Sequence, residues 1–300
     1  MGRIGPGFGG DSELTPTVYL NGRFISEADA KVCVRDGGWL HGAGLFETMR
    51  AENGRIFRLG SHLDRLCRSA AKLLAPIERG NLPSEETFIE LLRRNELKSA
   101  RVRLTVTAGA MQDGSDTQTQ SLTVCVTAAK LFPYSRELYE RGGHVVVCDF
   151  RTSPSDPVAG HKTTGYLPRL LGLREAQRAG CVEALWFTTA NRLAEGSVSN
   201  VFVARDGVLK TPPLDTPVLP GVARREVMDS AEAMGIEVEE SPIGIDELLD
   251  AEEVMLTNTM MQVMPVIRVE RHDIADGRVG PMSKRLLTAY RSRVRKECGE

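Results

Sequence analysis

The sequence predicts an α+β fold divided into two domains. The 300 residues, 41% of them hydrophobic, are enough for two ordinary globular domains of roughly 100–200 residues each. Short apolar runs rich in Val, Thr and Phe are joined by Asn-Gly and Asp-Gly pairs, which is typical of β-hairpins. Helical runs lie between them, and strands outnumber long helices in the second half, as expected for α+β domains.

The first half begins with two hairpins. Residues 17–25 turn at Asn21-Gly22 and residues 49–59 turn at Asn53-Gly54, both suited to the positive φ angles of a tight turn. Apolar residues at helical spacing predict a helix over 61–75 with Ser61 as its N-cap, and a second helix over 83–95 capped by Ser84. Strands are expected at 100–108 and 121–130, joined by a polar loop over 109–120.

The segment 130–143 shifts in composition and interrupts the strand pattern, so a domain boundary is expected there. Beyond it we expect a strand at 144–150, a helix over 166–180 ending at Gly180, and a strand at 183–189. A hairpin turning at Asp206-Gly207, a helix over 220–235 and a strand at 251–258 follow. The predicted division is a disordered leader over 1–15, an N-terminal α+β domain over 16–130, a linker over 131–140 and a C-terminal domain over 141–300.

Composition excludes several classes of function. A formal net charge of -2 and a pI near 6.3 provide no basic surface for nucleic acid or an anionic membrane. The six cysteines include no C-x-x-C pair, which indicates reduced thiols in a cytoplasmic protein and no metal site. No apolar run approaches the roughly 20 residues of a membrane span. We therefore expect a small-molecule enzyme.

Three features suggest chemistry when taken together. Lys162 follows an irregular loop and precedes a helix, Glu195 precedes an apolar strand, and Pro220-Gly221 precedes another helix. Each has an ordinary explanation, because most lysines are on the surface, acids occur in turns and many helices begin after glycine. Pyridoxal 5′-phosphate, however, requires an amine, an acid for its ring nitrogen and N–H donors for its phosphate. The three features supply one candidate for each requirement.

The order of several separate motifs resembles one family. "GLFETMRAENGRIFRLGSHLDRLCRSA", "HKTTGYLPRLLGLREA", "LAEGSVSNVFV", "LPGVARREV" and "LTNTMMQVMPV" are similar to the fold type IV, or class IV, pyridoxal-phosphate aminotransferases. That family contains branched-chain aminotransferases, D-amino acid transaminases, (R)-amine transaminases and aminodeoxychorismate lyases. The resemblance spans roughly residues 17–290. It implies a smaller N-terminal α/β domain, a larger pseudo-barrel C-terminal domain and the cofactor between them.

The resemblance also implies roles for individual residues. Lys162 matches the catalytic lysine that bonds to the cofactor and transfers protons, and Glu195 matches the carboxylate paired with the ring nitrogen. Arg65, which on its own reads as a helix-surface ion pair, matches the arginine that grips the phosphate. The other cofactor contacts implied by the family are the backbone of Val222 and Ala223, the Thr259 hydroxyl, and Tyr166 at the phenolic oxygen.

The sequence departs from the family pattern around the substrate. Ala223 replaces a common threonine, Gly165 replaces a common asparagine, and His41 lies where many relatives have Tyr or Phe. Ala108 occupies the position where many D-amino acid transaminases and lyases have an arginine for the substrate carboxylate. The candidates to replace that arginine are Arg35, Arg101 and Arg103.

The predicted function is transamination from an amino acid to a 2-keto acid. A D-amino acid, a branched-chain L-amino acid or a small (R)-amine is the expected donor, and the resemblance implies a homodimer in which a loop of the partner completes the pocket. The alternative is aminodeoxychorismate lyase, which forms 4-aminobenzoate and pyruvate, and which "NTMMQVMPV" and "FETMR" favour. A cofactor-binding regulatory or scaffold protein is the non-enzymatic alternative, and the lysine, glutamate and arginine together argue against it.

Overall fold

The computed structural model describes residues 15–111 and 122–299, which form two compact units. The N-terminal unit contains the described residues up to Phe132 together with His161–Tyr166 and the chain from Val294 onward. The C-terminal unit contains Pro133–Gly160 and Leu167–Arg293. All but the last residue of the leader predicted over 1–15, and most of the loop predicted over 109–120, lie outside the described residues.

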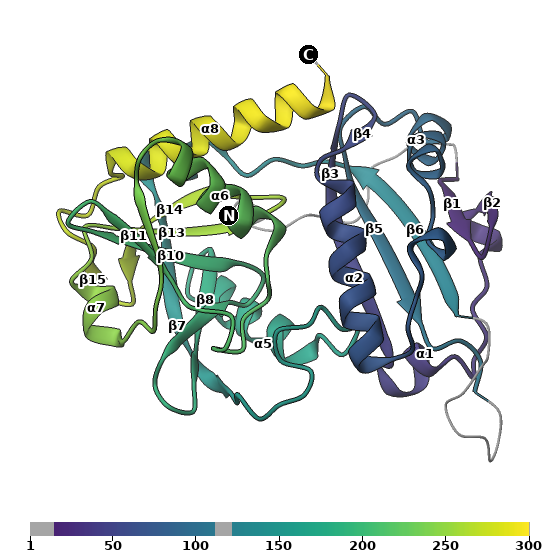
Figure 1. Ribbon diagram of the computed structural model, residues 1–300, viewed down its shortest axis with the longest axis horizontal. Coiled ribbons are helices and arrows are strands. Elements are labelled where there is room, and N and C mark those ends of the chain that lie inside the picture. The colour runs from purple at the N-terminus through teal and green to yellow at the C-terminus, as the bar shows by residue number, and fades with distance from the viewer. Residues whose placement is uncertain (1–14, 112–121, 300) are drawn as a thin grey trace. The chain divides into compact units, whose positions relative to one another are not determined.

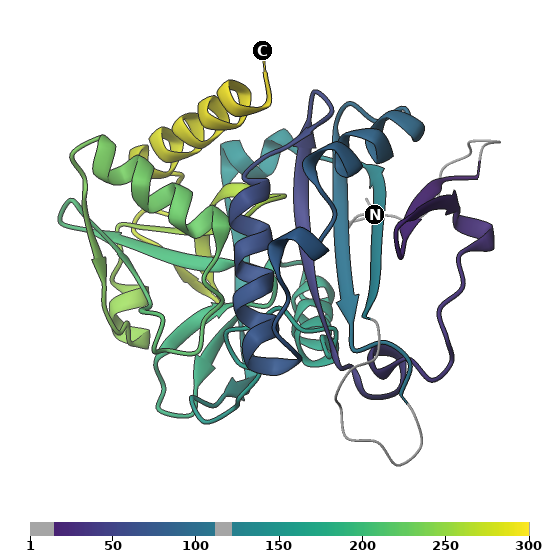
Figure 2. The same cartoon turned by 45° about the vertical axis from the view of Figure 1, so that its right-hand side comes forward.

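The N-terminal unit is built on a six-stranded antiparallel sheet in the order β2-β1-β6-β5-β3-β4. Figure 2 shows the β1–β2 hairpin at one edge. Asn21 and Asn53 have φ values of 47° and 50°, so both hairpin turns adopt the predicted left-handed conformation. The strands are β1 (Thr17–Leu20), β2 (Arg23–Ser26), β3 (Gly44–Glu52), β4 (Arg55–Ile56), β5 (Ala100–Thr107) and β6 (Thr123–Lys130).

Helix α2 (Leu59–Leu73) packs on β3 along one face of this sheet (Figure 1). The N-cap predicted at Ser61 is wrong. The helix begins two residues earlier because Arg58, directly after the β3–β4 hairpin, takes a left-handed conformation with φ 55° and starts the helical turn there. The cap predicted at Ser84 is confirmed, since its side chain accepts a hydrogen bond from Thr87 N–H in α3 (Glu85–Arg94). Short helices are α1 (Gly37–His41) and the 3-10 turns Glu27–Asp29 and Arg79–Asn81.

One segment predicted for the C-terminal domain packs with the N-terminal unit instead. β4 pairs with β3 only at Ala51 and Glu52, so the beginning of β3 keeps one side open. Residues 161–166 fill that side: Phe46 N–H donates to the Lys162 carbonyl at 2.9 Å, and Thr164 N–H donates to the Gly44 carbonyl at 2.8 Å. An open strand side satisfied by a distant segment has no local sequence signal.

The C-terminal unit contains a nine-stranded mixed sheet in the order β12-β11-β10-β13-β14-β7-β8-β9, with β15 paired to β14. The pairs β14–β7, β7–β8 and β11–β12 are parallel and the others are antiparallel. The predicted turn at Asp206-Gly207 is confirmed by φ values of 50° and 79°. The strands are β7 (Gly143–Thr152), β8 (Glu183–Thr188), β9 (Leu193–Gly196), β10 (Asn200–Arg205), β11 (Val208–Thr211), β12 (Glu237–Glu240), β13 (Glu253–Asn258), β14 (Gln262–Val269) and β15 (His272–Asp273).

Helices accompany this sheet along the described part of the chain. α5 (Leu167–Arg178) and α6 (Val222–Ala233) fall inside the helices predicted over 166–180 and 220–235. α4 (Arg136–Arg141) begins within the linker predicted over 131–140, ends one residue beyond it and packs on β14. α7 (Ile245–Leu249) and α8 (Pro281–Cys298) were not predicted. Within the described residues, no helix is both long and apolar enough to cross a membrane.

Candidate active site

Lys162 is fixed by its backbone on both sides. The Lys162 carbonyl accepts from Phe46 N–H, and Thr163 forms a β-bridge with Leu45. On either side, His161 Nδ1 lies 2.9 Å from Ser69 Oγ of α2, and Thr164 Oγ1–H donates to the Gly42 carbonyl at 2.8 Å. The lysine therefore extends from a short strand-like segment and not from a mobile loop.

The amine of Lys162 lies against two aromatic rings. Its Nζ is 4.4 Å from the ring centroid of Phe46 and 5.4 Å from that of Tyr166. The two rings meet edge to face, with centroids 5.2 Å apart and an interplanar angle of 85°. Cation–π contacts of this kind attract an amine electrostatically to the ring faces. Tyr166 thus lies beside Lys162.

Arg103 lies over the same Phe46 ring. Its Cζ is 3.7 Å from the ring centroid, and its Nε–H donates to Thr105 Oγ1 at 3.1 Å. Desolvation and the adjacent guanidinium of Arg101 lower the pKa of Arg103, although the residue as a whole remains exposed. An anion close to Arg103 would stabilise the charged form of its guanidinium. Lys162 and Arg103 thus offer an amine and a guanidinium around one aromatic ring.

The other predicted substrate residues lie at the ends of α1 and β5. His41 is the exposed last residue of α1. Ala108 follows β5, and its N–H donates to the Ala43 carbonyl at 3.0 Å. Arg35 is exposed ahead of α1, and its carbonyl accepts from Met111 N–H at 2.9 Å. The backbone contacts of Ala108 and Arg35 therefore lie around α1 and the end of β5.

Arg65 forms a buried cluster with two residues that the sequence analysis did not single out. Its Nε–H and Nη2–H donate to the two oxygens of Glu47 at 2.8 and 2.5 Å, and His62 Nδ1 lies 2.8 Å from Glu47 Oε2. Burial opposes ionisation of Glu47, but Arg65 and His62 outweigh it and lower its pKa to about 2. Burial also lowers the pKa of His62, so this imidazole is neutral and its Nε2 remains buried without a hydrogen-bond partner among the described residues.

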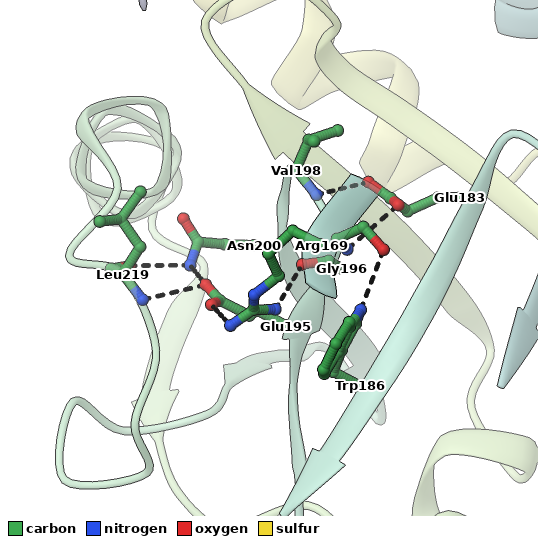
Figure 3. A network of polar contacts seen from close by, with 9 residues as sticks. Arg169, Glu183, Trp186, Glu195, Gly196, Val198, Asn200 and Leu219 are labelled. Carbon is green, nitrogen blue, oxygen red and sulfur yellow. Dashed lines mark hydrogen bonds and ion pairs between the residues drawn. The ribbon is translucent and has the colours of Figure 1, made fainter. Parts of the chain in front are cut away.

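Glu195 lies on β9 with both carboxylate oxygens occupied (Figure 3). Oε1 accepts from Arg169 Nη2–H at 2.6 Å, and Oε2 accepts from Leu219 N–H at 2.9 Å. Asn200 Nδ2 lies 3.4 Å from Oε2 and also donates to the Leu219 carbonyl at 2.9 Å. Glu195 is therefore a buried carboxylate held in one orientation by β10 and by the turn before α6.

The turn behind Glu195 is organised by a second buried acid. Glu183 on β8 accepts from the N–H groups of Ser197 and Val198, each at 3.1 Å, and from the Ser199 hydroxyl at 2.9 Å. Burial raises the pKa of Glu183. Gly196 has no room for a side chain here, since a Cβ would collide with Ser199 and Glu183. This packing explains the glycine after Glu195.

The beginning of α6 adjoins the same network. Val222 and Ala223 are its first two residues, and their backbone N–H groups point out of the helix N-terminus. Gly221 is the N-cap, and a Cβ at that position would collide with the side chain of Asn200. Leu219 and Asn200 thus join Glu195 to the helix start.

Thr259 is buried after β13, in a turn where Asn258 Oδ1 accepts from the N–H groups of Met260 and Met261.

The predicted site residues thus form two groups. The N-terminal unit brings Lys162, Tyr166 and Arg103 together around Phe46 and also contains Arg65. The C-terminal unit joins Glu195 to the start of α6 and contains Thr259. Among the described residues, no group of His, Cys, Asp and Glu side chains is arranged to bind a metal ion.

Comparison with known proteins identifies the family. Residues 44–269 match the family model for class IV amino-transferases. The chain is 34% identical over 275 residues to a putative branched-chain-amino-acid aminotransferase of Methanocaldococcus jannaschii, covering 91% of this chain and 95% of the relative. It is 33% identical over 256 residues to an aminodeoxychorismate lyase of Bacillus subtilis, covering 84% and 86%. Its fold matches that of the T.th. branched-chain amino acid aminotransferase with pyridoxamine 5′-phosphate, with a TM-score of 0.87, 30% identity and coverage of 95% and 97%.

Class IV aminotransferases use pyridoxal 5′-phosphate, and the side chains described above fit that cofactor. They provide an amine against two aromatic rings, a buried carboxylate with fixed oxygens, and a helix N-terminus that begins at a glycine. The α+β architecture of the two units agrees with the fold of these enzymes. The chain therefore belongs to the class IV aminotransferase family and is an enzyme of that type.

Proposed function

We propose that this enzyme transfers the amino group of a branched-chain L-amino acid to a 2-keto acid. The observation that carries the proposal is the position of Arg103, which shares the Phe46 ring with Lys162. Guanidinium groups bind carboxylates as planar forks, so Arg103 offers a partner for the substrate carboxylate beside the reacting amine. Ala108 provides no cation where many D-amino acid transaminases have arginine, and this favours the branched-chain donor.

We assign the cofactor contacts as follows. Bound pyridoxal phosphate supplies an aldehyde carbon that bonds to amines and a protonated ring that accepts electrons from the substrate Cα. Lys162 Nζ would hold the cofactor through that carbon, and its amine would take the Cα proton from the substrate and give a proton back before the product amine forms. Glu195 holds the ring-nitrogen proton. Arg65, the N–H groups of Val222 and Ala223, and the Thr259 hydroxyl bind the phosphate, and Tyr166 binds the phenolic oxygen.

The overall reaction is balanced without an external oxidant. The donor loses its amino group, its Cα proton and the electron pair of the Cα–H bond, takes an oxygen from water and leaves as a 2-keto acid. The acceptor keto acid loses its carbonyl oxygen as water, gains the same amino group, the electron pair and a Cα proton, and leaves as an amino acid. Lys162 Nζ would handle the proton in both halves, from its position over the rings of Phe46 and Tyr166.

Aminodeoxychorismate lyase activity is the second candidate, because the Bacillus subtilis relative covers most of the chain at 33% identity. The substrate of that reaction carries two carboxylates, each of which needs a cationic or N–H partner in a closed site. Arg103 supplies one, and Ala108 supplies none. Transamination therefore remains the first choice.

The proposal also includes a cytoplasmic homodimer. All six cysteines are free thiols, which suits a reducing compartment. Apolar side chains are exposed around α1, where Val34 and Trp39 are each 77% exposed and Leu40 is 50% exposed. Several large apolar side chains exposed close together in the sequence are typical of a protein interface.

A donor panel tests the proposal. Purified enzyme would be given L-leucine, L-valine, L-isoleucine, D-alanine, D-glutamate, (R)-1-phenylethylamine or aminodeoxychorismate, with 2-oxoglutarate or pyruvate as acceptor. We expect the branched-chain L-amino acids to react fastest. Arg103→Gln should raise the KM for L-leucine by about 10–100-fold and leave the carboxylate-free amine unaffected, because a charge-assisted contact is worth roughly 1.5–3 kcal/mol. Arg55→Gln, an exposed arginine on β4, is the control.

Two results would overturn the proposal. Faster turnover of D-alanine or D-glutamate would exclude the branched-chain assignment. Release of pyruvate and 4-aminobenzoate from aminodeoxychorismate, without transfer from any amino acid, would establish the lyase instead.

A further inference from the structure

Arg169 is a cation bound directly to the carboxylate of Glu195 (Figure 3). It lies in the first turn of α5, and its Nη2–H donates to Glu195 Oε1 at 2.6 Å. The side chains of both residues are largely buried, with 17% and 8% exposed. A close ion pair that is this well shielded from water interacts strongly. The carboxylate in this ion pair belongs to Glu195, the residue that we assign to the ring nitrogen of the cofactor.

Arg169 is held in this position by two further contacts. Its Nη1–H donates to the Gly196 carbonyl at 3.2 Å, and its guanidinium lies over the Trp186 ring at 4.5 Å from the centroid. Trp186 is itself fixed, because its Nε1–H donates to Ser197 Oγ at 2.9 Å. One turn further along α5, a Cβ on Gly172 would meet Ser197 Oγ at 2.9 Å and Trp186 Cζ2 at 3.2 Å. The absence of a side chain at Gly172 lets α5 approach closely enough for Arg169 to reach Glu195.

The other hydrogen-bond partners of Glu195 among the described residues are neutral. Leu219 N–H and the Asn200 amide contact Oε2 and carry no charge. Glu183 is a nearby buried acid, and its oxygens accept from the turn at Ser197–Ser199 and from Ala184 N–H. Within the described chain, the ion pair that reaches Glu195 therefore comes from Arg169.

We propose that Arg169 is a positioning residue that fixes Glu195 and takes a share of its negative charge, so that Glu195 holds the cofactor ring proton less tightly than an unpaired glutamate would. The inference rests on the proposed function, because it places Glu195 at the ring nitrogen. A guanidinium and a ring N–H are two positive partners of one carboxylate, and each weakens the attraction of the other. Arg169 thereby limits how strongly the ring withdraws electrons from the substrate Cα.

The experiment is an NMR titration of cofactor labelled with 15N in its ring, bound to the intact enzyme. The 15N shift reports protonation of the ring nitrogen as the pH is raised, independently of turnover. Arg169→Gln should raise the pKa of the ring nitrogen by at least about one unit, a tenfold gain in proton affinity, because it removes a charge close to the carboxylate. Arg169→Lys retains the charge and should titrate close to the wild type. Arg178→Gln, an exposed arginine on the same helix, is the matched control.

A purely structural role for Arg169 predicts the opposite sign. If Arg169 only tethers α5, its loss would misalign Glu195, and the ring nitrogen would lose its proton at a lower pH. A decrease, or no change, in Arg169→Gln would therefore overturn the inference, and so would a Lys variant that behaves like Gln. If Arg169→Gln fails to bind cofactor, the Lys variant and Arg169→Met, which retains most of the side-chain volume, give the same comparison.

Glu195→Gln separates this inference from the proposed function. Glu195→Gln should lower the ring-nitrogen pKa, because the negative partner of the proton is gone. If it does while Arg169→Gln leaves the pKa unchanged, only the role of Arg169 is wrong. If Glu195→Gln has no effect either, the assignment of Glu195 is wrong and the role of Arg169 falls with it.

Discussion

At the scale of single residues, Lys162 provides the most direct test of the site. Its Nζ lies over Phe46 and Tyr166 while its backbone is hydrogen-bonded to β3. Borohydride reduction of the loaded enzyme should attach the cofactor to the peptide that contains Lys162, and Lys162→Ala should abolish the attachment. Lys72→Ala, an exposed lysine on α2, should retain it. Mass spectrometry of the labelled peptides decides the matter, and a label on any other lysine would exclude Lys162.

The buried pair of Glu47 and Arg65 predicts how stability depends on pH. The pKa of Glu47 falls from 4.5 to about 2 on folding, so the unfolded chain takes up a proton before the folded chain does. The stabilisation is fully present above pH 4.5 and is lost as the pH falls through that value toward 2, and it amounts to about 3 kcal/mol. The neutral His62 acts in the same direction below its ordinary pKa of 6.5, since burial lowers its pKa in the folded state.

Glu47→Gln should therefore destabilise the enzyme at neutral pH by about 3–5 kcal/mol, because it leaves Arg65 buried without its carboxylate. The free energy of unfolding of the variant should also depend less steeply on pH between 4.5 and 2, because the contribution of Glu47 is gone. Urea unfolding at several pH values measures both effects. Glu90→Gln is the control, since Glu90 also pairs with arginines but lies on the exposed face of α3, where water screens the pairs. Equal effects of the two substitutions would contradict the role of burial.

The sequence allowed some of these residues to be identified, but not their partners. Lys162, Glu195 and Arg65 stand in motifs whose order along the chain resembles a known family. Glu47 and His62 lie within the quoted "FETMR" and "SHLDRL" stretches, and the spacing of His62 and Arg65 on one face of a helix was a usable signal. Arg169 had none. It differs from a surface arginine only because α5 packs on β8 through Gly172, and that contact arises from the tertiary fold.

At the scale of elements, the start of α6 depends on the absence of a side chain at Gly221. Its φ of -64° suits any residue, so the requirement comes from Asn200, whose side chain occupies the space of a Cβ. Gly221→Ala should cost about 1–3 kcal/mol through overpacking. It should also weaken cofactor affinity, because Asn200 and Leu219 hold Glu195 and lead into the helix.

Gly244→Ala is a matched control for that substitution. Gly244 is also a helix N-cap with an extended backbone, at the start of α7, and a Cβ there meets nothing within 4 Å. Thermal unfolding and cofactor titration of the two variants test the argument together. If Gly221→Ala is as mild as Gly244→Ala in both measurements, close packing against Asn200 is not what requires the glycine.

Elements with a strong local signal were predictable, and elements defined by distant partners were not. The three hairpin turns followed from Asn-Gly and Asp-Gly pairs, because few other residues adopt the positive φ angles that such turns need. The start of α2 at Leu59 depends on a left-handed Arg58, for which the sequence has no marker. The pairing of 161–166 with β3 depends on the short length of β4, about 100 residues earlier in the chain.

At the scale of the whole molecule, the exposed apolar residues around α1 test the proposed homodimer. Trp39 and Val34 expose large apolar surfaces that a monomer would leave in water, and buried tryptophans commonly dominate the energy of an interface. A twofold dimer would use the same surface on both subunits, so one substitution removes two contacts. Trp39→Lys should weaken the dimer by at least about 30-fold, the equivalent of roughly 2 kcal/mol.

Ile89→Lys, on the exposed face of α3, is the control and should leave the association unchanged. Sedimentation velocity across a concentration series measures the shift. A wild-type monomer, or a Trp39→Lys dimer as tight as the wild type, would contradict the proposal, and a Trp39→Lys monomer that retains full activity would show that the partner's loop is not needed to complete the pocket.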